Sequence, residues 1–486
     1  MGDDQSGLGS YVGGTAQHDA DVVILGMGAA GEDLGLRLAD AGLDVVGIEA
    51  ELLGGECPYW ACIPSKMMIR AANLLQEARR ANGVAGRVEV TPDWAPVAAR
   101  VREEATGDWN DSYAVARFES KGGRFVRGRG RFVKPGTVAS GDAHYVARRG
   151  VVVATGSRPR IPSIPGLSDA PYWTTRDAIK ADSLPSSMIV LGAGGAGCEL
   201  GQVFSRFGVD VTIVEAEDRI LPLEEREASD AVAATFEAEG ITVTTGARVE
   251  RVEGSDELIS LGLADGTTMS AERLLVTAGR AVDLDGIGAD AAGIARADGY
   301  IGVDERLRAA DGIWAVGDVT GHPMFTHTAL YQASIAAADI LDEDVVPADY
   351  RAFPRVTFTD PEVGAVGMSE SEARAVGVVV GVALKRLPAT FRGWLHGPGN
   401  DGLIKLVVDR ESGTLVGATS VGPHGGETLG LLSVLVHARI PLREVRHMIY
   451  AYPTFHGALG EALGAYARGI GKVIDPDYPI DDAFEW

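Results

Sequence analysis

The sequence predicts an α/β fold, because a strand, a glycine-rich turn and a helix follow one another at two separate places in the chain. The first copy combines an apolar strand at residues 21–25 with a turn at 26–31, and the second combines a strand at 188–191 with a turn at 192–197. The chain has 486 residues, of which 46% are hydrophobic, so it is long enough for about three domains. We therefore expect two Rossmann-like dinucleotide-binding domains and one further domain.

The first turn carries three glycines with distinct expected tasks. Gly26 permits the tight turn, Gly28 lets the backbone approach a pyrophosphate at the helix N-terminus, and Gly31 lets helix and strand pack closely. The next predicted strand, at 44–49, ends in Glu49, which lies 18 residues after Gly31 and can accept a hydrogen bond from a ribose hydroxyl. The flanking strand, helix and acid distinguish this motif from a chance glycine turn.

The second turn repeats the pattern. Its glycines are Gly192, Gly194 and Gly197. Glu215 again lies 18 residues after the third glycine, at the end of a predicted strand. Residues 151–157 and 274–280 form another repeat, in which an apolar strand ends in a turn of small residues. Two such folds in one chain indicate two bound dinucleotides.

Two of the three cysteines, Cys57 and Cys62, are separated by only four residues. This spacing allows a disulfide across one tight turn, and Pro64 suits the first turn of a helix that begins near Cys62. The unpaired N–H groups and positive dipole end of such a helix stabilise a thiolate and lower the thiol pKa. We therefore expect an exchangeable redox pair. A structural staple is the alternative, but so small a loop constrains the unfolded chain little.

The composition limits the partners and the location. The formal net charge of −24 and an isoelectric point of about 4.8 argue against nucleic acid or an anionic membrane as a partner. No Lys or Arg precedes Arg37, and no uncharged apolar run approaches the ~18 residues of a membrane span. We expect a cytoplasmic protein without a metal site. Residues 1–19 are rich in Gly, Ser and Asp and are expected to form a disordered or tag-like tail.

Further motifs carry a family resemblance. The dithiol segment reads C-x4-C-I-P-S-K, and later segments read W-A-V-G-D at 314–318 and F-T-D-P-E-V-G at 358–364. Together with the glycine turns and the strand-end turns, they resemble the pyridine nucleotide-disulfide oxidoreductases over about residues 20–465. This flavoprotein family includes dihydrolipoamide dehydrogenase, glutathione reductase, mercuric reductase and soluble transhydrogenase. The resemblance implies that the first glycine turn binds FAD and the second a nicotinamide nucleotide.

The resemblance also assigns roles to single residues. Asp318 is expected to hold the flavin ribityl chain, and Lys66 is expected near the flavin N5 atom in an ion pair with Glu199. A buried lysine and a buried glutamate need each other, because either alone carries an uncompensated charge. The expected cofactor-binding residues are Gly26, Gly28, Gly31, Glu49, Lys66, Gly130, Thr155, Gly156, Ser157, Asp318, Gly192, Gly194, Gly197, Glu215 and Gly279.

The family pattern implies a domain division and a homodimer. The expected parts are an FAD domain at residues 20–160 and 285–349, an NAD(P) domain at 161–284, an α+β dimerisation domain at 350–470 and a tail at 471–486. In the dimerisation domain, strands are expected at 402–408 and 415–419, and a helix is expected to run through residues 429–437.

The C-terminal segment departs from the disulfide reductases of this family, which carry His-Pro-Thr with a glutamate five residues after the histidine. Here Tyr452 takes the histidine place and Gly457 takes the glutamate place. His456 and Glu461 repeat the five-residue step one helical turn later, which moves a side chain by about 5.4 Å. His456 is therefore either the proton-transferring base or a packing residue. The candidate catalytic residues are Cys57, Cys62, Lys66, Glu199, Tyr452 and His456.

Other departures narrow the function. The chain lacks the C-terminal cysteine pair typical of mercuric reductases, and it has the redox pair that soluble transhydrogenase lacks. Gly195 stands where many relatives place a Tyr over the nicotinamide pocket, which predicts a more open pocket. Tyr59 and Trp60, between the two cysteines, either pack or shape the acceptor site. Cys198 is expected to be a small buried hydrophobe.

We expect an oxidoreductase that passes electrons from NAD(P)H through FAD to the cysteine pair and on to a small-molecule acceptor, in the first place a disulfide. A reductase of quinones or metal ions is the alternative that the missing histidine favours, and a non-catalytic flavin redox sensor is the third possibility. NADH is expected over NADPH. The 2′-phosphate of NADPH would meet Glu215, Glu217 and Asp218, with only Arg219 as a nearby cation.

Overall fold

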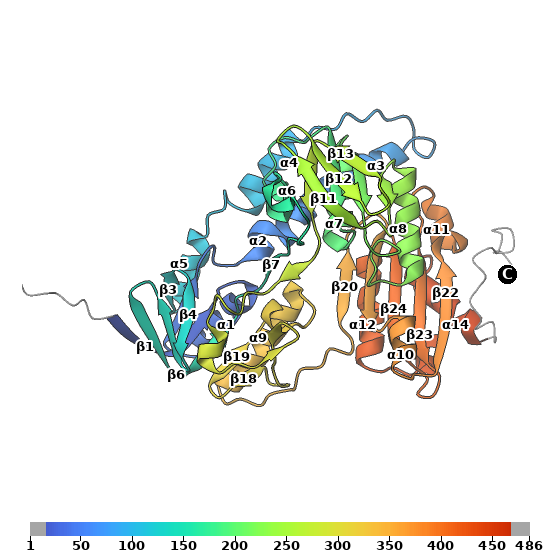
Figure 1. Cartoon of the computed structure of the whole chain (residues 1–486). Coiled ribbons are helices and arrows are strands. Elements are labelled where there is room, and N and C mark those ends of the chain that lie inside the picture. The colour runs from blue at the N-terminus through green and yellow to red at the C-terminus, as the bar shows by residue number, and fades with distance from the viewer. Residues whose placement is uncertain (1–15, 468–486) are drawn as a thin grey trace, which may run out of the picture. The chain divides into compact units, whose positions relative to one another are not determined.

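The computed structural model describes residues 16–467 (Figure 1). These residues form two compact units. The first unit comprises residues 16–57, 109–158 and 281–348, and the second comprises 58–108, 159–280 and 349–467. Both units combine sheets with helices, so the predicted α/β class is confirmed. The tail expected at 471–486 lies outside the described residues, as does the part of the N-terminal tail at 1–15.

The first unit is built on a mainly parallel sheet of strand order β18-β19-β6-β1-β2-β3. Its strands are β1 (Ala16–Leu25), β2 (Val45–Glu49), β3 (Arg124–Arg127), β6 (Ala143–Val153), β18 (Arg308–Ala310) and β19 (Ile313–Ala315), extended by β4 (Gly130–Lys134) and β5 (Thr137–Ser140). Val22 and Ile24 of β1 pack in one core with α1 (Ala29–Asp40) and α9 (Thr326–Ile340). Val23 and Leu25 belong to the core on the opposite face. Burial on both faces explains why this strand reads as a continuous apolar run.

Strand β1 begins earlier than the sequence predicts. We expected residues 16–19 to belong to a tail, but they are part of β1 and pair in parallel with residues 143–146 of β6. The tail prediction is therefore wrong for these four residues. The side chains of residues 16–19 are exposed and mostly polar, so this part of the strand is held by backbone pairing and carries no hydrophobic signature.

The second unit contains a four-stranded parallel sheet of order β10-β9-β8-β14. Its strands are β8 (Ser187–Leu191), β9 (Asp210–Val214), β10 (Thr242–Thr244) and β14 (Arg273–Val276), and its helices are α7 (Gly195–Arg206) and α8 (Arg226–Ala238). An antiparallel sheet of β11 (Val249–Gly254), β12 (Ile259–Leu263) and β13 (Thr268–Ala271) adjoins it in sequence. The long helix α3 (Cys62–Arg80) packs against α7. This packing brings the dithiol helix to the helix of the second glycine turn.

The C-terminal part of the second unit, here called the C-terminal sheet, is antiparallel with the order β20-β21-β24-β23-β22 (Figure 1). The strands are β20 (Pro354–Thr357), β21 (Glu362–Gly367), β22 (Val380–Arg386), β23 (Leu403–Asp409) and β24 (Thr414–Gly422). Helices α12 (Gly425–His437) and α14 (Gly457–Ala467) pack against it through Leu429, Leu432 and Leu459. The two strands predicted here are present within three residues of their expected bounds, and the predicted helix begins four residues earlier than expected.

The remaining elements are short. They are α2 (Glu56–Trp60), α4 (Ala95–Arg100), the π-helical turn η1 (Val101–Ala105), α5 (Ser112–Ser120), β7 (Arg158–Pro159), η2 (Leu167–Asp169), α6 (Thr175–Ile179), β15 (Arg280–Ala281), η3 (Ala289–Ala292), β16 (Arg296–Ala297), β17 (Tyr300–Ile301), η4 (Asp318–Thr320), α10 (Glu370–Ala375), η5 (Leu387–Ala389), α11 (Phe391–His396) and α13 (Leu442–Arg446). Among residues 16–467, no helix has both the length and the apolar character that a membrane crossing requires.

Candidate active site

The first glycine turn leaves room for a pyrophosphate at the N-terminus of α1. Gly26 has a positive φ of 95°, and a Cβ atom there would lie 2.5 Å from the carbonyl oxygen of Ala154. A Cβ on Gly31 would lie 2.1 Å from the carbonyl oxygen of Gly26. A Cβ on Gly28, in contrast, would have only the Cα of Gly55 within 4 Å, at 3.9 Å. Two glycines thus serve packing, and the third opens onto space at the positive end of a helix.

The second glycine turn has the same geometry. Gly192 has a φ of 104° and lies close to the carbonyl oxygen of Thr277, and a Cβ on Gly197 would lie 2.1 Å from the oxygen of Gly192. A Cβ on Gly194 would meet nothing within 4 Å. Both turns therefore fit the phosphates of a dinucleotide.

The two acids that follow the turns are tied to them by hydrogen bonds. Glu49 accepts from the backbone N–H of Met27 at 2.8 Å and from that of Glu51 at 2.7 Å. Glu215 accepts from Ala193 at 2.6 Å and from Glu217 at 3.0 Å. Burial raises the pKa of the Glu49 carboxyl, although these two backbone hydrogen bonds oppose the effect. A carboxylate oxygen has two lone pairs, so each acid retains capacity for a ribose hydroxyl.

The strand-end turns of the first unit lie at the same sheet edge as Gly26. β6 is parallel to β1, and β19 is parallel to β6, so Ser157 and Asp318 follow the carboxyl ends of neighbouring strands. The Ser157 hydroxyl donates a hydrogen bond to the Asp318 carboxylate. Thr155 and Gly156 precede Ser157 in the same turn. This edge is where an open α/β sheet binds its ligand.

Two further glycines expected at cofactors are placed differently. Gly130 begins β4, and a Cβ there would lie 2.4 Å from Cδ1 of Leu25, in the core of the sheet. Its visible task is close packing. Gly279 follows β14 with a φ of 103°, and its carbonyl oxygen accepts from the backbone N–H of Arg160 at 2.9 Å. Gly279 therefore lies at the carboxyl edge of the parallel sheet in the second unit.

The dithiol segment places Cys62 at the start of a long helix. Cys57 lies in α2, and Cys62 is the first residue of α3, in which Pro64 occupies the first turn. Both cysteine side chains are half-buried. The residue before the helix, Ala61, makes no side-chain cap, and the first turn of α3 contains no acidic residue. The positive end of the helix dipole lies at Cys62, which favours the thiolate.

One turn after Cys62, Lys66 forms an ion pair with Glu199 of α7. The Lys66 Nζ lies 2.7 Å from Glu199 Oε2, and Glu199 Oε1 accepts from the backbone N–H of Phe358 at 2.8 Å. The Lys66 Nζ also lies 4.7 Å from the centre of the Phe358 ring. The structure therefore brings together the two residues expected to pair and adds Phe358. Phe358 is the first residue of the 358–364 motif, so that motif could have pointed to Phe358 as a site residue.

A second set of contacts, which sequence reasoning missed, extends this pair along α3 and α7. Arg206 donates to Asn73 at 2.6 Å, to Asp360 at 2.7 Å and to both oxygens of Glu239. Gln202 exchanges hydrogen bonds of 2.8 Å with the backbone N–H and C=O of Asp360. Asn73 lies seven residues after Lys66, so the two face the same side of α3. These contacts fix the segment that carries Phe358.

The C-terminal segment does not assemble the histidine and glutamate that the sequence suggested. Glu461 forms an ion pair with Lys385 at 3.0 Å, and His456 Nε2 lies 3.4 Å from the Thr454 hydroxyl. Tyr452 is 74% exposed and packs edge-on against Phe391. Both roles predicted for His456, base and packing residue, therefore stay predictions. Tyr452 remains available at the surface.

Residues around the dithiol and the second turn make several packing contacts, which leave both roles predicted for Tyr59 and Trp60 open. Tyr59 is buried, and Trp60 lies beneath the cations of Lys180 and Arg176, at 4.7 and 5.2 Å from the ring centre. Cys198 is fully buried, its Sγ lies 3.3 Å from the Ala193 oxygen, and burial raises its thiol pKa. The prediction that Cys198 is a small buried hydrophobe is confirmed. A Cβ on Gly195 would lie 3.3 Å from the Thr357 hydroxyl.

Comparison with known proteins identifies the family. Residues 20–333 match the family described as pyridine nucleotide-disulphide oxidoreductase, and residues 353–463 match the dimerisation domain of that family. The chain belongs to this family. It is therefore an oxidoreductase flavoenzyme that uses FAD and a pyridine nucleotide, as the resemblance implied.

Individual relatives are of two kinds. The dihydrolipoyl dehydrogenase of Chlorobaculum tepidum is 32% identical over 93% of this chain and 98% of its own length, and that of Mycobacterium tuberculosis is 34% identical over 91% and 97%. Among solved structures, the HOCl-induced flavoprotein disulfide reductase RclA from Escherichia coli, as a Cu(II) complex, has a TM-score of 0.81 and 25% identity, covering 92% of this chain and 99% of its own. LpdA from Mycobacterium tuberculosis has a TM-score of 0.80 and 28% identity, with the same coverage.

Proposed function

We propose that this protein uses NADH to reduce a small disulfide, with Cys57 and Cys62 as the redox pair. The observation that carries the proposal is the position of Cys62 at the N-terminus of α3, one turn before the Lys66–Glu199 ion pair. A bound flavin supplies the hydride acceptance that the side chains lack. Lys66 and Glu199 neutralise each other, so the ammonium can be held beside the flavin without an uncompensated charge.

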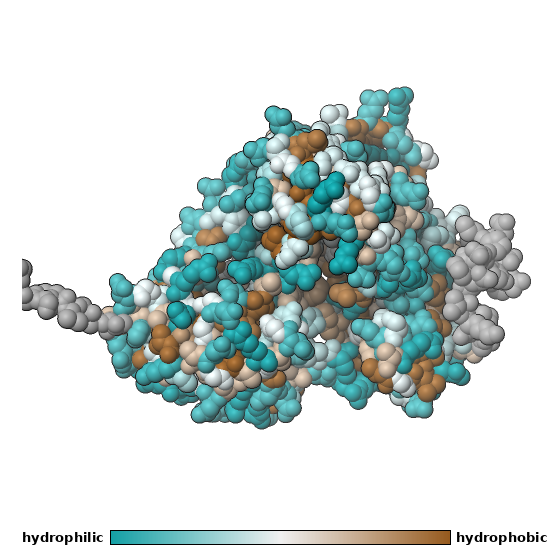
Figure 2. Space-filling view, viewed as in Figure 1, coloured by the Kyte–Doolittle hydropathy of each residue, from teal (hydrophilic) through white to brown (hydrophobic). Residues whose placement is uncertain are grey.

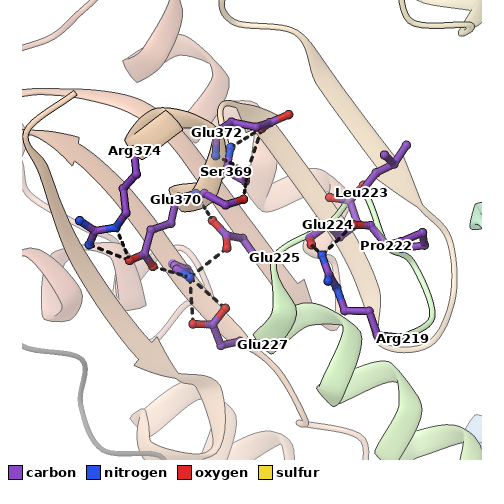
Figure 3. Close-up of polar contacts among 12 residues, drawn as sticks. Arg219, Pro222, Leu223, Glu224, Glu225, Glu227, Ser369, Glu370, Glu372 and Arg374 are labelled. Atoms are coloured by element: carbon purple, nitrogen blue, oxygen red, sulfur yellow. Dashed lines mark hydrogen bonds and ion pairs between the residues drawn. The ribbon is translucent and has the colours of Figure 1, made fainter. Parts of the chain in front are cut away.

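The preference for NADH rests on the acids around Glu215. Glu215 presents carboxylate oxygens where the adenosine ribose is expected, and Glu217 and Asp218 follow it. Arg219 donates to the carbonyl oxygens of Pro222 at 2.7 Å and Glu224 at 3.3 Å (Figure 3). Arg219 also lies 3.4 Å from Asp218, and Asp218 forms a further ion pair with Arg226, so Glu215 and Glu217 are the acids of this group that form no ion pair among the described residues. Since Arg219 is engaged within its own loop, a 2′-phosphate would meet negative charge. A higher kcat/KM with NADPH than with NADH would contradict this inference.

A reductase of metal ions or quinones is the second candidate. It is favoured by the exposed Tyr452 in place of a histidine base and by the engagement of Glu461 with Lys385. Such acceptors need less help with thiol protonation than a disulfide does. The solved structure of RclA as a Cu(II) complex adds weight to a metal acceptor.

We also infer that the protein is a homodimer of three-part subunits. The match to a dimerisation domain supports this, as do the exposed apolar residues Val434, Met448 and Ile449 of the same part of the chain. Figure 2 shows apolar surface in the region that Figure 1 draws in orange and red. We propose the domain limits 16–160 with 285–349, 161–284 and 350–470, where residues 16–19 are added because they belong to β1. A cytoplasmic location suits a dithiol that must remain exchangeable.

Anaerobic titration with NADH, followed by an acceptor screen, tests the proposal. Bleaching of the bound flavin by NADH would support an enzyme, whereas a flavin that NADH leaves oxidised would favour the non-catalytic sensor. The screen measures NADH oxidation with oxidised glutathione, lipoamide, cystine-type dithiols, quinones, Hg(II) and Cu(II). A disulfide with the highest kcat/KM supports the first candidate, and a metal ion or quinone supports the second.

A further inference from the structure

The loop between β9 and α8, residues 215–225, is here called the coenzyme loop because it begins with Glu215. Its first part is fastened to the second glycine turn. Glu215 accepts from the backbone N–H of Ala193 at 2.6 Å, and the backbone N–H of Leu221 donates to the oxygen of Ala193 at 2.8 Å. The carboxylate of Glu215 and the backbone of the loop at Leu221 are therefore fastened to the same residue of the second glycine turn.

The last part of the coenzyme loop is fastened to the C-terminal sheet. Arg355 of β20 forms two hydrogen bonds to the two carboxylate oxygens of Glu224, at 2.7 and 3.0 Å. Lys405 of β23 is buried and lies 2.9 Å from Glu225. The second oxygen of Glu225 accepts from the backbone N–H of Glu370 at 2.7 Å. Glu224 therefore binds Arg355 of β20, and the next residue, Glu225, binds Lys405 of β23 and the backbone of Glu370.

Figure 3 shows three carboxylates, those of Glu225, Glu227 and Glu370, converging on one nitrogen, which is the Nζ of Lys405. The three distances lie between 2.8 and 3.0 Å. The ammonium group donates hydrogen bonds to Glu225 and to both oxygens of Glu227, and Glu370 completes the set as an ion pair at 3.0 Å. Such a site has one geometry, and moving Glu225 away would leave a buried charge without its partner.

The carboxylate of Glu225 is not needed for the helix that it precedes. Glu225 is the N-cap residue of α8, yet its side chain makes no cap hydrogen bond and points to Lys405 and Glu370 instead. A bidentate arginine–carboxylate pair such as Arg355–Glu224 likewise specifies orientation as well as energy. Both features are arranged to connect the coenzyme loop with the C-terminal sheet.

We propose that Arg355 and Lys405 are positioning residues for the nicotinamide nucleotide. They hold the coenzyme loop in the conformation that presents Glu215 to the adenosine ribose, and they set both the affinity for the nucleotide and the discrimination against a 2′-phosphate. This inference rests on the proposed use of NADH, which it deepens by assigning part of nucleotide recognition to the C-terminal sheet.

Calorimetric titration of the FAD-loaded protein with ADP-ribose, and with ADP-ribose 2′-phosphate, tests the proposal. The variants are Arg355→Met, Glu224→Gln, their double variant and Lys405→Met. The matched control is Lys385→Met, which removes a lysine ion pair with Glu461 from the same sheet. Lys405→Met removes the cation that pairs with three carboxylates, so this variant can fail to fold. The proposal is therefore judged by Arg355→Met and Glu224→Gln.

We expect Arg355→Met and Glu224→Gln each to raise the Kd for ADP-ribose about tenfold, or ~1.4 kcal/mol. The double variant should show the same loss as Arg355→Met alone, because that variant already removes the pair with Glu224 as well as the hydrogen bond to the Leu223 oxygen. In these variants the Kd for ADP-ribose 2′-phosphate divided by the Kd for ADP-ribose should fall toward unity. The rate of flavin reduction at saturating NADH should stay within about twofold of that of the unaltered protein, because the variants do not change the chemical step. Lys385→Met should leave every value at that of the unaltered protein.

Unchanged Kd values in Arg355→Met and Glu224→Gln, together with an unchanged preference between the two nucleotides, would overturn the proposal. A lower Tm without a change in Kd would do so as well, because it would show that the anchors serve stability alone. Failure of the proposed function is distinguishable, since it would appear in the unaltered protein as a flavin that NADH does not reduce.

Discussion

Two lysines of the second unit pair with glutamates, and the two sites differ in how completely the ammonium group is satisfied. The side chain of Lys66 is 35% exposed and has one carboxylate partner among the described residues, Glu199 at 2.7 Å. The side chain of Lys405 is 3% exposed and has three such partners. The first site keeps donors that can respond to a cofactor, and the second keeps none.

The difference fits the role proposed for Lys66 beside the flavin and the positioning role proposed for Lys405. Burial lowers the pKa of Lys405, but the hydrogen bonds and charges of Glu227, Glu225 and Glu370 outweigh it and raise the pKa well above its ordinary value. Lys405 is therefore charged at neutral pH. Lys66 lies on the helix that begins with Cys62, where a half-satisfied ammonium can contribute to the reaction.

Among the variants of these two sites, Cys62→Ser should have the largest effect. Cys62 begins the helix that carries Lys66, so this variant tests the function proposed for the Lys66 site. We expect disulfide turnover to be lost, and we expect the long-wavelength charge-transfer band that accompanies two-electron reduction to be lost with it, while FAD stays bound. The reason is that the band requires a thiolate beside the flavin. Anaerobic absorbance titration with NADH measures it, with Cys198→Ala as the control that keeps the band. A band that survives in Cys62→Ser would reject this assignment.

The two lysines can be compared directly by replacing each with Met. Lys405→Met leaves three glutamates with one fewer cation in a buried site and should lower the free energy of unfolding by about 3–5 kcal/mol. Lys66→Met breaks a more exposed pair and should cost only ~1–3 kcal/mol. Urea denaturation of both variants measures the difference. If the two variants lose equal free energy of unfolding, or Lys66→Met loses more, the number of carboxylate partners does not explain the difference between the two sites.

A third test concerns proton transfer by the C-terminal segment. A phenol is a poor proton acceptor compared with an imidazole, so Tyr452→His with Gly457→Glu should raise disulfide reduction by ~10²-fold or more. Flavin reduction by NADH should not change. Steady-state and stopped-flow rates measure the two steps. A Cβ at position 457 would lie 3.3 Å from the Thr454 hydroxyl, so a small local adjustment is needed.

His456→Ala is the companion variant for that test. Since Glu461 pairs with Lys385, we expect acceptor turnover to stay within about twofold, as for a packing residue. Loss of acceptor turnover with an intact NADH half-reaction would instead identify His456 as the base.

The smallest expected effect is a dependence of stability on pH at the Lys405 site. Burial raises the pKa of Glu370, but the hydrogen bonds from Arg374 and Lys405 lower it by more than burial raises it. The pKa of Glu370 therefore lies below its ordinary value of 4.5. A group with a depressed folded-state pKa contributes stability above its unfolded pKa and loses it as the pH falls through the folded value. Unfolding free energies measured below pH 4.5 should therefore decline less steeply in Glu370→Gln than in the unaltered protein. Parallel pH profiles would contradict this linkage.

Local chemistry made much of the molecule predictable. The glycine turns, the acids 18 residues after them and the helix that begins at Cys62 all depend on residues close in sequence, where backbone geometry and the helix dipole act directly. The Lys66–Glu199 pair spans 133 positions, and only the resemblance to a family pointed to it. The strand at residues 16–19 was missed because its side chains are polar and exposed, and only pairing with β6 defines it.

The sequence by itself determined the fold class, the two dinucleotide turns and the dithiol, because each is written in contiguous residues with a fixed spacing. The tertiary structure decided which of the 68 acidic residues meet which cations. By spacing alone, Glu461 could have been the partner of His456, but the packing of α14 against β22 places Glu461 beside Lys385. Glu225 and Lys405 are 180 positions apart. A charge pair of this kind depends on the packing of whole elements, and side-chain charge alone carries no information on which elements will meet.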